Sequence, residues 1–174
     1  MKTVYILCSL LFVSMTSTAQ EVKVNLITEA EFNAITYNGA TIADIEATDG
    51  VEFVLRKLFG DYMTKKESDV FDSITFQYHF NQMSYDYEYD RVISITIKDN
   101  TWPVVVQGNT FRVGDSIDDL QQKFGAGFKT YTSEYASGRI FTGFNFETND
   151  YNALNVRFDP DTERITRIKY YLIP

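Results

Sequence analysis

The spacing of apolar residues along the chain predicts three short helices. Between Val51 and Phe59 they recur at i, i+3, i+4, i+7 and i+8, which is the spacing of one helix face. Asp49 is placed to cap this helix with Glu52 at N3, and Gly60 suits its end. The pattern therefore predicts a helix over about 50–59 with a single apolar stripe.

The other two helices are marked by their first residues. The order Thr28-Glu29-Ala30-Glu31 has the form of a capping box and predicts a brief helix from about Glu29 to Ile35. Ser116 begins a second pattern, which stops at Gly125. Because each helix is apolar on one side only, each needs a sheet to cover that side.

Strict alternation of apolar and polar residues predicts the strands. Between Phe71 and Phe80, Ile74, Phe76 and Tyr78 share one face, while Gln77 and His79 share the other. Similar alternation runs through residues 85–90, 93–98, 144–146, 154–158 and 168–172. One apolar and one polar face per strand is typical of antiparallel sheets that meet water on one side.

The two halves of the chain repeat the same order of signals. Asn38-Gly39 precedes a helix that ends at Phe59-Gly60, and Gln107-Gly108 precedes one that ends at Phe124-Gly125. Alternating strands follow each helix. The sequence thus predicts an α+β fold of two tandem modules, residues 20–101 and 102–174, each a short helical segment packed on an antiparallel sheet of about three to four strands.

Residues 1–19 have the features of an export signal. Lys2 is followed by an apolar run over residues 4–13, and Ser17-Thr18-Ala19 supplies small residues before a cleavage point at Ala19-Gln20. A run of ten is too short to cross a bilayer, which needs about 20 residues as a helix. We therefore expect an exported chain, periplasmic or secreted, with no integral membrane segment after cleavage. Whether Cys8 ever carries a lipid is left open.

Cleavage changes the available chemistry. It removes Cys8, the only cysteine, so that no disulfide or thiol nucleophile remains. It also leaves 15 basic against 24 acidic residues, a net charge of −9. This charge repels phosphate backbones, so nucleic acid is not an expected partner.

Catalytic and cofactor signals are weak. His79 is the only histidine, which excludes a histidine-based triad or a multi-histidine metal site within one chain. The glycines fit no phosphate-binding loop, and residues 159–163 lack the later ligands of a calcium loop. We expect no enzyme, no metal and no cofactor. A hydrolase with a carboxylate pair is the last-ranked alternative.

The tyrosines offer the main binding signal. Tyr85, Tyr87 and Tyr89 alternate with acidic residues, so their rings either face inward against a helix or form contact anchors on an exposed sheet. With His79 they are the predicted binding residues.

Two resemblances bear on function. The stretch from Phe111 to Leu120, continuing to Phe124-Gly125, resembles a recurring segment of SmpA/OmlA-like envelope lipoproteins, and the tandem order resembles the β-lactamase-inhibitor-protein-like architecture. These resemblances imply non-catalytic proteins that bind other proteins through sheet surfaces and loops. The chain departs from the inhibitors because it can form no disulfide after cleavage. It departs from the lipoproteins because Leu7 precedes Cys8, where their lipid-attachment signal needs a small residue.

The predicted function is non-catalytic binding of another, extracytoplasmic protein, as an inhibitor, an immunity-type protein or an envelope assembly accessory. A polar, aromatic and acidic sheet face would dock onto a more basic partner. The alternative is a small-molecule carrier or sensor with an aromatic-lined pocket between helix and sheet.

Overall fold

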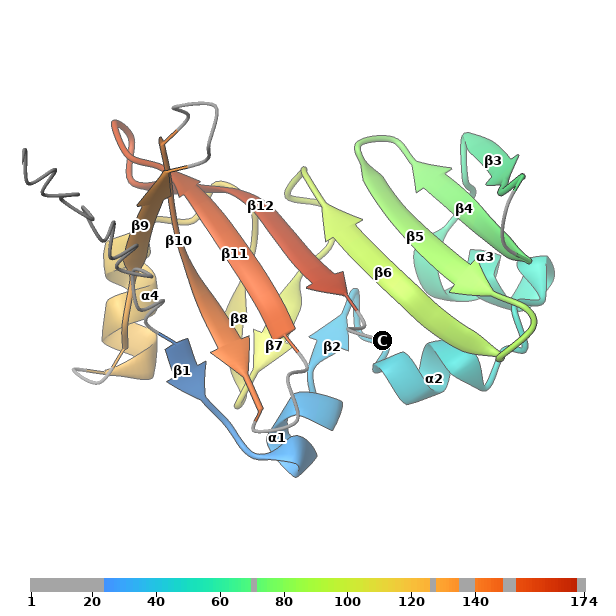
Figure 1. Ribbon diagram of the computed structural model, residues 1–174, viewed down its shortest axis with the longest axis horizontal. Helices are drawn as coiled ribbons and strands as arrows, with labels where there is room; N and C mark the ends of the chain where they lie inside the picture. Colours follow the sequence, from blue (N-terminus) through green and yellow to red (C-terminus); the bar gives the residue numbers. More distant parts are fainter. Residues whose placement is uncertain (1–23, 70–71, 126–127, 135–139, 149–152, 172–174) are drawn as a thin grey trace, which may run out of the picture.

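One large sheet dominates the computed structural model, which describes residues 24–69, 72–125, 128–134, 140–148 and 153–171. Its strands run in the order β1-β10-β11-β12-β6-β5-β4-β3, and β9 also pairs with β10 (Figure 1). The bounds are β1 Val24–Leu26, β3 Thr64–Glu67, β4 Ser73–Tyr78, β5 Asn81–Asp86, β6 Arg91–Ile97, β9 Tyr131–Glu134, β10 Ile140–Glu147, β11 Ala153–Asp159 and β12 Arg164–Tyr171.

The predicted fold class is wrong in one decisive respect. The two antiparallel sets, β3 to β6 and β9 to β12, do not form separate sheets, because β6 and β12 pair with each other antiparallel. Strand β1 then pairs with β10 in parallel, which makes the sheet mixed. Pairing satisfies backbone groups that each edge strand would otherwise expose. The result is a mainly β protein with short helices.

The remaining elements lie on one face of the large sheet (Figure 1). They are the small sheet β2-β7-β8 and the four helices of the described residues, with bounds β2 Thr36–Tyr37, β7 Val104–Val106, β8 Asn109–Phe111, α1 Glu29–Asn33, α2 Ile42–Glu46, α3 Glu52–Phe59 and α4 Ile117–Phe124. The core fills the space between them and the sheet. It includes the fully buried side chains of Ile45, Leu55, Phe76, Phe111 and Ile168.

The caps at the N-termini of the helices were predicted correctly in two cases and wrongly in one. Thr28 and Glu31 form the expected capping box of α1, and the Ser116 hydroxyl caps α4 as predicted. The predicted Asp49 cap of α3 is wrong, because Asp49 and Gly50 have φ values of 49° and 65° and form a turn before the helix. Helix α2, with a capping box of its own, was not predicted.

Local geometry recurs in the two halves. Helices α3 and α4 both end on a glycine with nearly the same conformation, φ 83° at Gly60 and φ 82° at Gly125. Asn38 and Gln107, each followed by glycine, both have positive φ in turns of the small sheet. The division into repeats at residues 101 and 102 remains a prediction.

Within the described residues, no helix combines the length and apolar character needed to cross a membrane. The proposed export signal, Cys8 and the cleavage point at Ala19-Gln20 lie outside the described residues.

Candidate functional site

The face of the large sheet opposite the helices carries polar side chains in rows. Directly paired residues of antiparallel strands share a face. One row crosses five strands, from β4 to β11, through Gln77, Gln82, Thr96, Lys169 and Asn155. A second row contains Thr75, Ser84, Ser94 and Tyr171. We call this surface the open sheet face, since in Figure 1 the helices and the small sheet lie behind it.

Positive charge gathers on this face although the chain as a whole is acidic. Arg157 on β11 is paired directly with Arg167 on β12, and Lys169 lies two residues further along β12. The Lys169 ammonium also lies 5.4 Å from the centroid of the Tyr171 ring. The sequence predicted an acidic docking face, in keeping with the net charge of −9 after cleavage. That expectation is wrong for this part of the sheet.

A hydrogen-bond network fixes polar side chains on the part of the open sheet face formed by β10 and β11. The Asn155 side-chain amide donates to Asn145 Oδ1 at 2.6 Å and to the Tyr131 hydroxyl at 2.7 Å. The Asn145 amide in turn donates to Glu147 at 2.8 Å. Such networks fix side chains in one arrangement and lower the entropy lost on binding.

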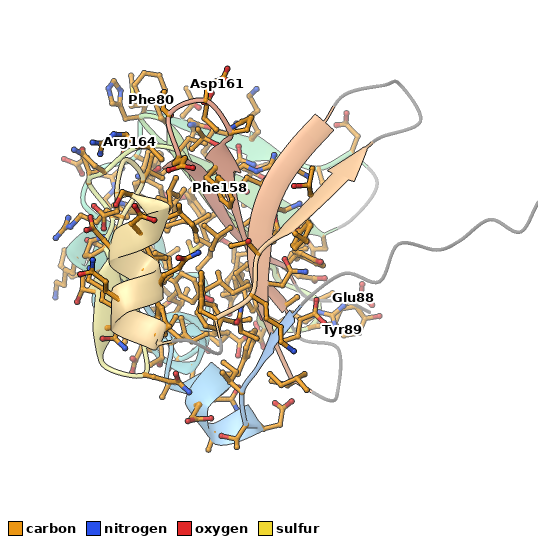
Figure 2. All side chains as sticks on the ribbon, turned by 90° about the vertical axis from the view of Figure 1, so that its left-hand side faces the viewer. Phe80, Glu88, Tyr89, Phe158, Asp161 and Arg164 are labelled. Carbon is orange, nitrogen blue, oxygen red and sulfur yellow. The ribbon has the colours of Figure 1, made fainter. Side chains whose placement is uncertain are left out.

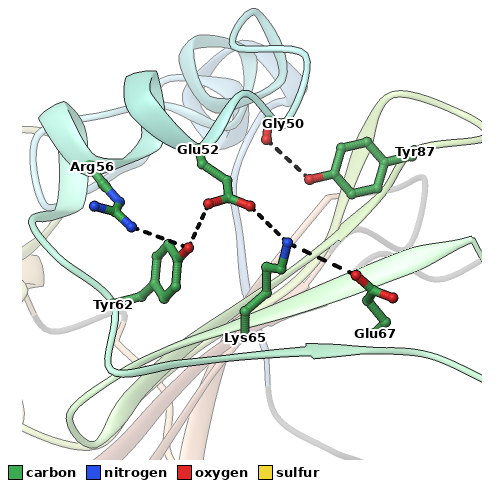
Figure 3. Close-up of polar contacts among 7 residues, drawn as sticks. All are labelled: Gly50, Glu52, Arg56, Tyr62, Lys65, Glu67 and Tyr87. Carbon is green, nitrogen blue, oxygen red and sulfur yellow. Dashed lines mark hydrogen bonds and ion pairs between the residues drawn. The ribbon is translucent and has the colours of Figure 1, made fainter.

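Two of the predicted contact tyrosines belong to the interior. Tyr85 is fully buried and its hydroxyl donates to the Glu46 carbonyl at 3.3 Å. Tyr87 is half-buried and donates to the Gly50 carbonyl at 3.1 Å (Figure 3). Both rings therefore pack against the segment between α2 and α3, which is the inward-facing alternative left open by their alternation.

The other two predicted residues are exposed but lie apart. Tyr89 occupies the β5–β6 turn, is 60% exposed and lies beneath the Arg91 guanidinium, 4.9 Å from its ring centroid. His79 was predicted to lie within a strand. Strand β4 ends at Tyr78 instead, and His79 has φ 56° in the following turn, 4.3 Å from the ring of Phe80. Figure 2 shows Phe80 and Tyr89 on opposite sides of the molecule.

A hollow of about 410 Å³ lies beside His79. We call it the aromatic hollow, because Phe59, Tyr78 and Trp102 line it and pack against one another with ring centroids 4.7–5.9 Å apart. Polar lining comes from Asn38, Asp61 and Thr101, and the exposed side chain of Met63 completes it with His79. Of the residues that line it, sequence reasoning named only His79 as a binding residue, since they come from four separate segments. The isolated Trp102 was the one available signal.

The hydroxyl of Tyr78 has no hydrogen-bond partner among the described residues, although Tyr78 is only 5% exposed. Burial raises the pKa of this hydroxyl well above its ordinary value. A buried hydroxyl left unsatisfied costs about 1–3 kcal/mol of stability. The ring of Tyr78 lines the hollow, but its hydroxyl oxygen has almost no accessible surface and so does not open onto it.

Polar contacts tie the wall of the hollow to helix α3 (Figure 3). The Tyr62 hydroxyl donates to Glu52 at 2.5 Å, and Lys65 on β3 donates to the other Glu52 oxygen at 2.8 Å. Hydrogen bonding from Lys65, then from Tyr62, lowers the pKa of the Glu52 carboxyl. These contacts hold Tyr62 against the helix, between Asp61 and Met63, which line the hollow.

The described residues contain no cluster of three or more histidine, cysteine or carboxylate side chains able to hold a metal ion. Among their carboxyl groups, every resolved pKa displacement is downward, as in Glu31, Asp44, Glu52, Asp99 and Asp159.

Comparison with known proteins yields little. No family model matches the chain, and no curated protein matches it. One solved structure, an extracellular protein containing an SCP domain from Bacillus anthracis str. Ames, is similar with a TM-score of 0.44 and 11% sequence identity. The similarity covers 69% of this chain and 42% of that one. At this level neither fold nor function transfers from that protein.

Proposed function

We propose that this chain is a non-catalytic binding protein that docks another protein on its open sheet face. The observation that carries the proposal is the combination of ordered polar rows with a cluster of cations on the sheet face opposite the described helices. A continuous sheet offers a wide and rigid surface, and rigid surfaces lose less entropy on association.

The charge of the face defines the partner. Arg157, Arg167 and Lys169 present positive charge on two adjacent strands, so a complementary partner carries an acidic patch. Complementary charge raises the association rate and excludes partners of the same sign. Tyr171, beside Lys169, adds an aromatic ring of the kind enriched at binding hot spots.

Export belongs to the same proposal. The signal features of residues 1–19 favour a location in the periplasm or outside the cell, where the chain would meet an extracytoplasmic protein. The resemblance to β-lactamase-inhibitor-protein-like and SmpA/OmlA-like proteins favours the same function.

Affinity capture with paired variants tests the proposal. Wild-type protein, the double variant Arg167→Gln/Lys169→Gln and the control Lys57→Gln/Lys123→Gln are immobilised and exposed to envelope extract of the native cell. Both variants lose two positive charges, but Lys57 and Lys123 lie in the last turns of α3 and α4, away from the sheet face. We expect one protein to be retained by wild type and control, and lost from the sheet-face variant.

The retained protein should also elute at rising salt, because exposed charge contacts are screened. Equal retention by all three proteins would place the contact elsewhere. Absence of any protein specific to the wild type would contradict the proposed function itself.

A further inference from the structure

One part of the open sheet face carries no charge. Between the Asp86–Arg91 pair at one end and Lys98 at the other, the positions of β4, β5 and β6 on this face hold only uncharged polar side chains. A solvated surface normally includes charged residues, and the adjacent cation cluster on β11 and β12 does so. We call the uncharged set the neutral strip, which consists of Thr75, Gln77, Gln82, Ser84, Ser94 and Thr96.

The composition of the neutral strip does not suit a protein partner. Serine is depleted at protein–protein interfaces, and the aromatic and arginine side chains that anchor such interfaces are absent from the strip. Hydroxyl and amide side chains both donate and accept hydrogen bonds. A ligand that matches the strip is therefore uncharged and rich in groups that do the same.

The hydrogen bonds within the neutral strip leave part of its capacity unused. The hydroxyls of Thr75 and Ser84 bond to each other at 2.8 Å. The Gln77 amide donates to two backbone carbonyls at 2.6 and 3.1 Å, which fixes this side chain and leaves its amide oxygen as an acceptor. Gln82 and Ser94 form no side-chain hydrogen bond within the described residues, and their polar atoms reach solvent.

An aromatic ring borders the neutral strip. Tyr171 on β12 is paired directly with Ser94 on β6, and its ring is half-buried on the same face. The C–H groups on the face of a sugar ring pack against the electron-rich face of an aromatic ring. Together Tyr171 and the strip offer both contacts that sugars use, packing against a ring and hydrogen bonds to hydroxyl groups.

We propose that the neutral strip binds a neutral polysaccharide, with Tyr171 packed on one sugar ring and Gln82 and Ser94 hydrogen-bonded to sugar hydroxyls. The four strands from β12 to β4 span about 14 Å at about 4.8 Å per strand, which is about the length of three sugar rings. The polar rows continue to Thr64 on β3 and to Asn155 on β11, so a longer chain can follow them in both directions. This binding goes beyond the proposed protein partner, which contacts the cation cluster.

Titration calorimetry with oligosaccharides of one length tests the proposal. The neutral probes are cellohexaose, mannohexaose, xylohexaose and maltohexaose, and the acidic probe is hexagalacturonate. We expect saturable binding of at least one neutral probe, equally tight at low and high salt, because contacts between uncharged groups are not screened. Binding of none of the four would overturn the proposal. So would binding of hexagalacturonate alone, lost at high salt, since this result assigns the face to anions.

Two variants and one control locate the contact. Gln82→Leu and Ser94→Ala should each weaken binding of the neutral probe about three- to tenfold, the value of one hydrogen bond. Gln122→Leu makes the same change on an exposed residue of α4 and should leave the affinity unchanged. Unchanged affinity in both strip variants would contradict the proposed site. Thermal unfolding at the wild-type temperature shows that each variant is folded.

The charge variant separates this proposal from the protein partner. Arg167→Gln/Lys169→Gln should bind the neutral oligosaccharide as the wild type does, because it leaves Gln82 and Ser94 in place. Conversely, Gln82→Leu should still retain the captured protein. Loss of oligosaccharide binding in the charge variant would show that the cations, rather than the neutral strip, hold the sugar.

Discussion

The last phenylalanine of α3 and that of α4 occupy similar places but have different neighbours. Phe59 packs against Tyr78 and Trp102 at centroid distances of 5.9 and 4.7 Å. Phe124 packs against Phe128 and Phe146 at 5.6 and 5.0 Å. The first cluster carries hydroxyl and indole N–H groups beside an open hollow, whereas these phenylalanine rings carry no polar atom.

The comparison shows that shared backbone geometry does not determine the chemistry built on it. Both helices end on a glycine of the same conformation. What differs is which aromatic residues follow, and therefore whether polar atoms are buried. A phenylalanine cluster gains stability from packing alone, while the tyrosine-containing cluster also retains a buried polar group at a cost.

The largest expected effect is in the phenylalanine cluster. Phe146→Ala should lower the free energy of unfolding by about 3–5 kcal/mol, because Phe146 is 1% exposed and the deletion leaves a cavity. Phe59→Ala should fall at the lower end of this range, since Phe59 already borders the hollow. Urea unfolding of both variants measures the difference. A larger loss for Phe59→Ala would contradict the contrast between the clusters.

The two helix-ending glycines should respond alike. Gly60 and Gly125 have φ near 82° and ψ near 180°, a region open essentially to glycine alone. No atom lies within 4 Å of a Cβ added at either position, so the penalty is one of backbone strain. Gly60→Ala and Gly125→Ala should each cost about 1–3 kcal/mol. Chemical denaturation that gives clearly unequal losses would show that the two helix ends are not equivalent.

Alkaline pH should lower the stability of the fold, because it favours ionisation of buried tyrosine hydroxyls. Burial raises the pKa of Tyr85 to about 12 and that of Tyr170 to about 12, against about 10 in the unfolded chain. Both pKa values are higher in the folded state, so their contribution to stability is complete below pH 10 and is lost as the pH rises from 10 towards 12.

Urea unfolding midpoints measured from pH 8 to pH 12 test this dependence. Tyr85→Phe should make the alkaline decline shallower because one raised hydroxyl is removed. An unchanged slope would mean that Tyr85 ionises as readily in the folded state as in the unfolded chain.

The smallest expected effect concerns the polar contacts in Figure 3. Glu52→Gln removes the ion pair with Lys65, which is partly exposed on both sides. Exposed pairs contribute little and are screened by salt. The unfolding midpoint should fall slightly at low salt, and the difference from wild type should shrink at high salt. A salt-independent loss would show that packing rather than charge is affected.

The candidate sites were only partly predictable. The alternation pattern predicted that His79 is exposed. It did not predict that His79 lies in a turn and lines the hollow together with Trp102. Tyr85, Tyr87 and Tyr89 do not form one binding surface, and the reason is local. Strand β5 ends at Asp86, and its register with β6 shifts between Ser84 and Tyr85. The extra residue of this shift is Ile93 on β6, so Tyr85 and Tyr87 stay on the inward side, and only Tyr89, in the turn after β5, leaves it.

By itself the sequence determined the features that depend on neighbouring residues: the caps at Thr28 and Ser116, the helix ends at Gly60 and Gly125, and the alternation within strands. These depend on interactions a few residues apart. Only the tertiary structure decided which strand edges meet, as in the pairing of Ile97 with Ile168. It also decided that cations gather on one sheet face and that four segments line a hollow, because these outcomes depend on register between residues distant in the chain.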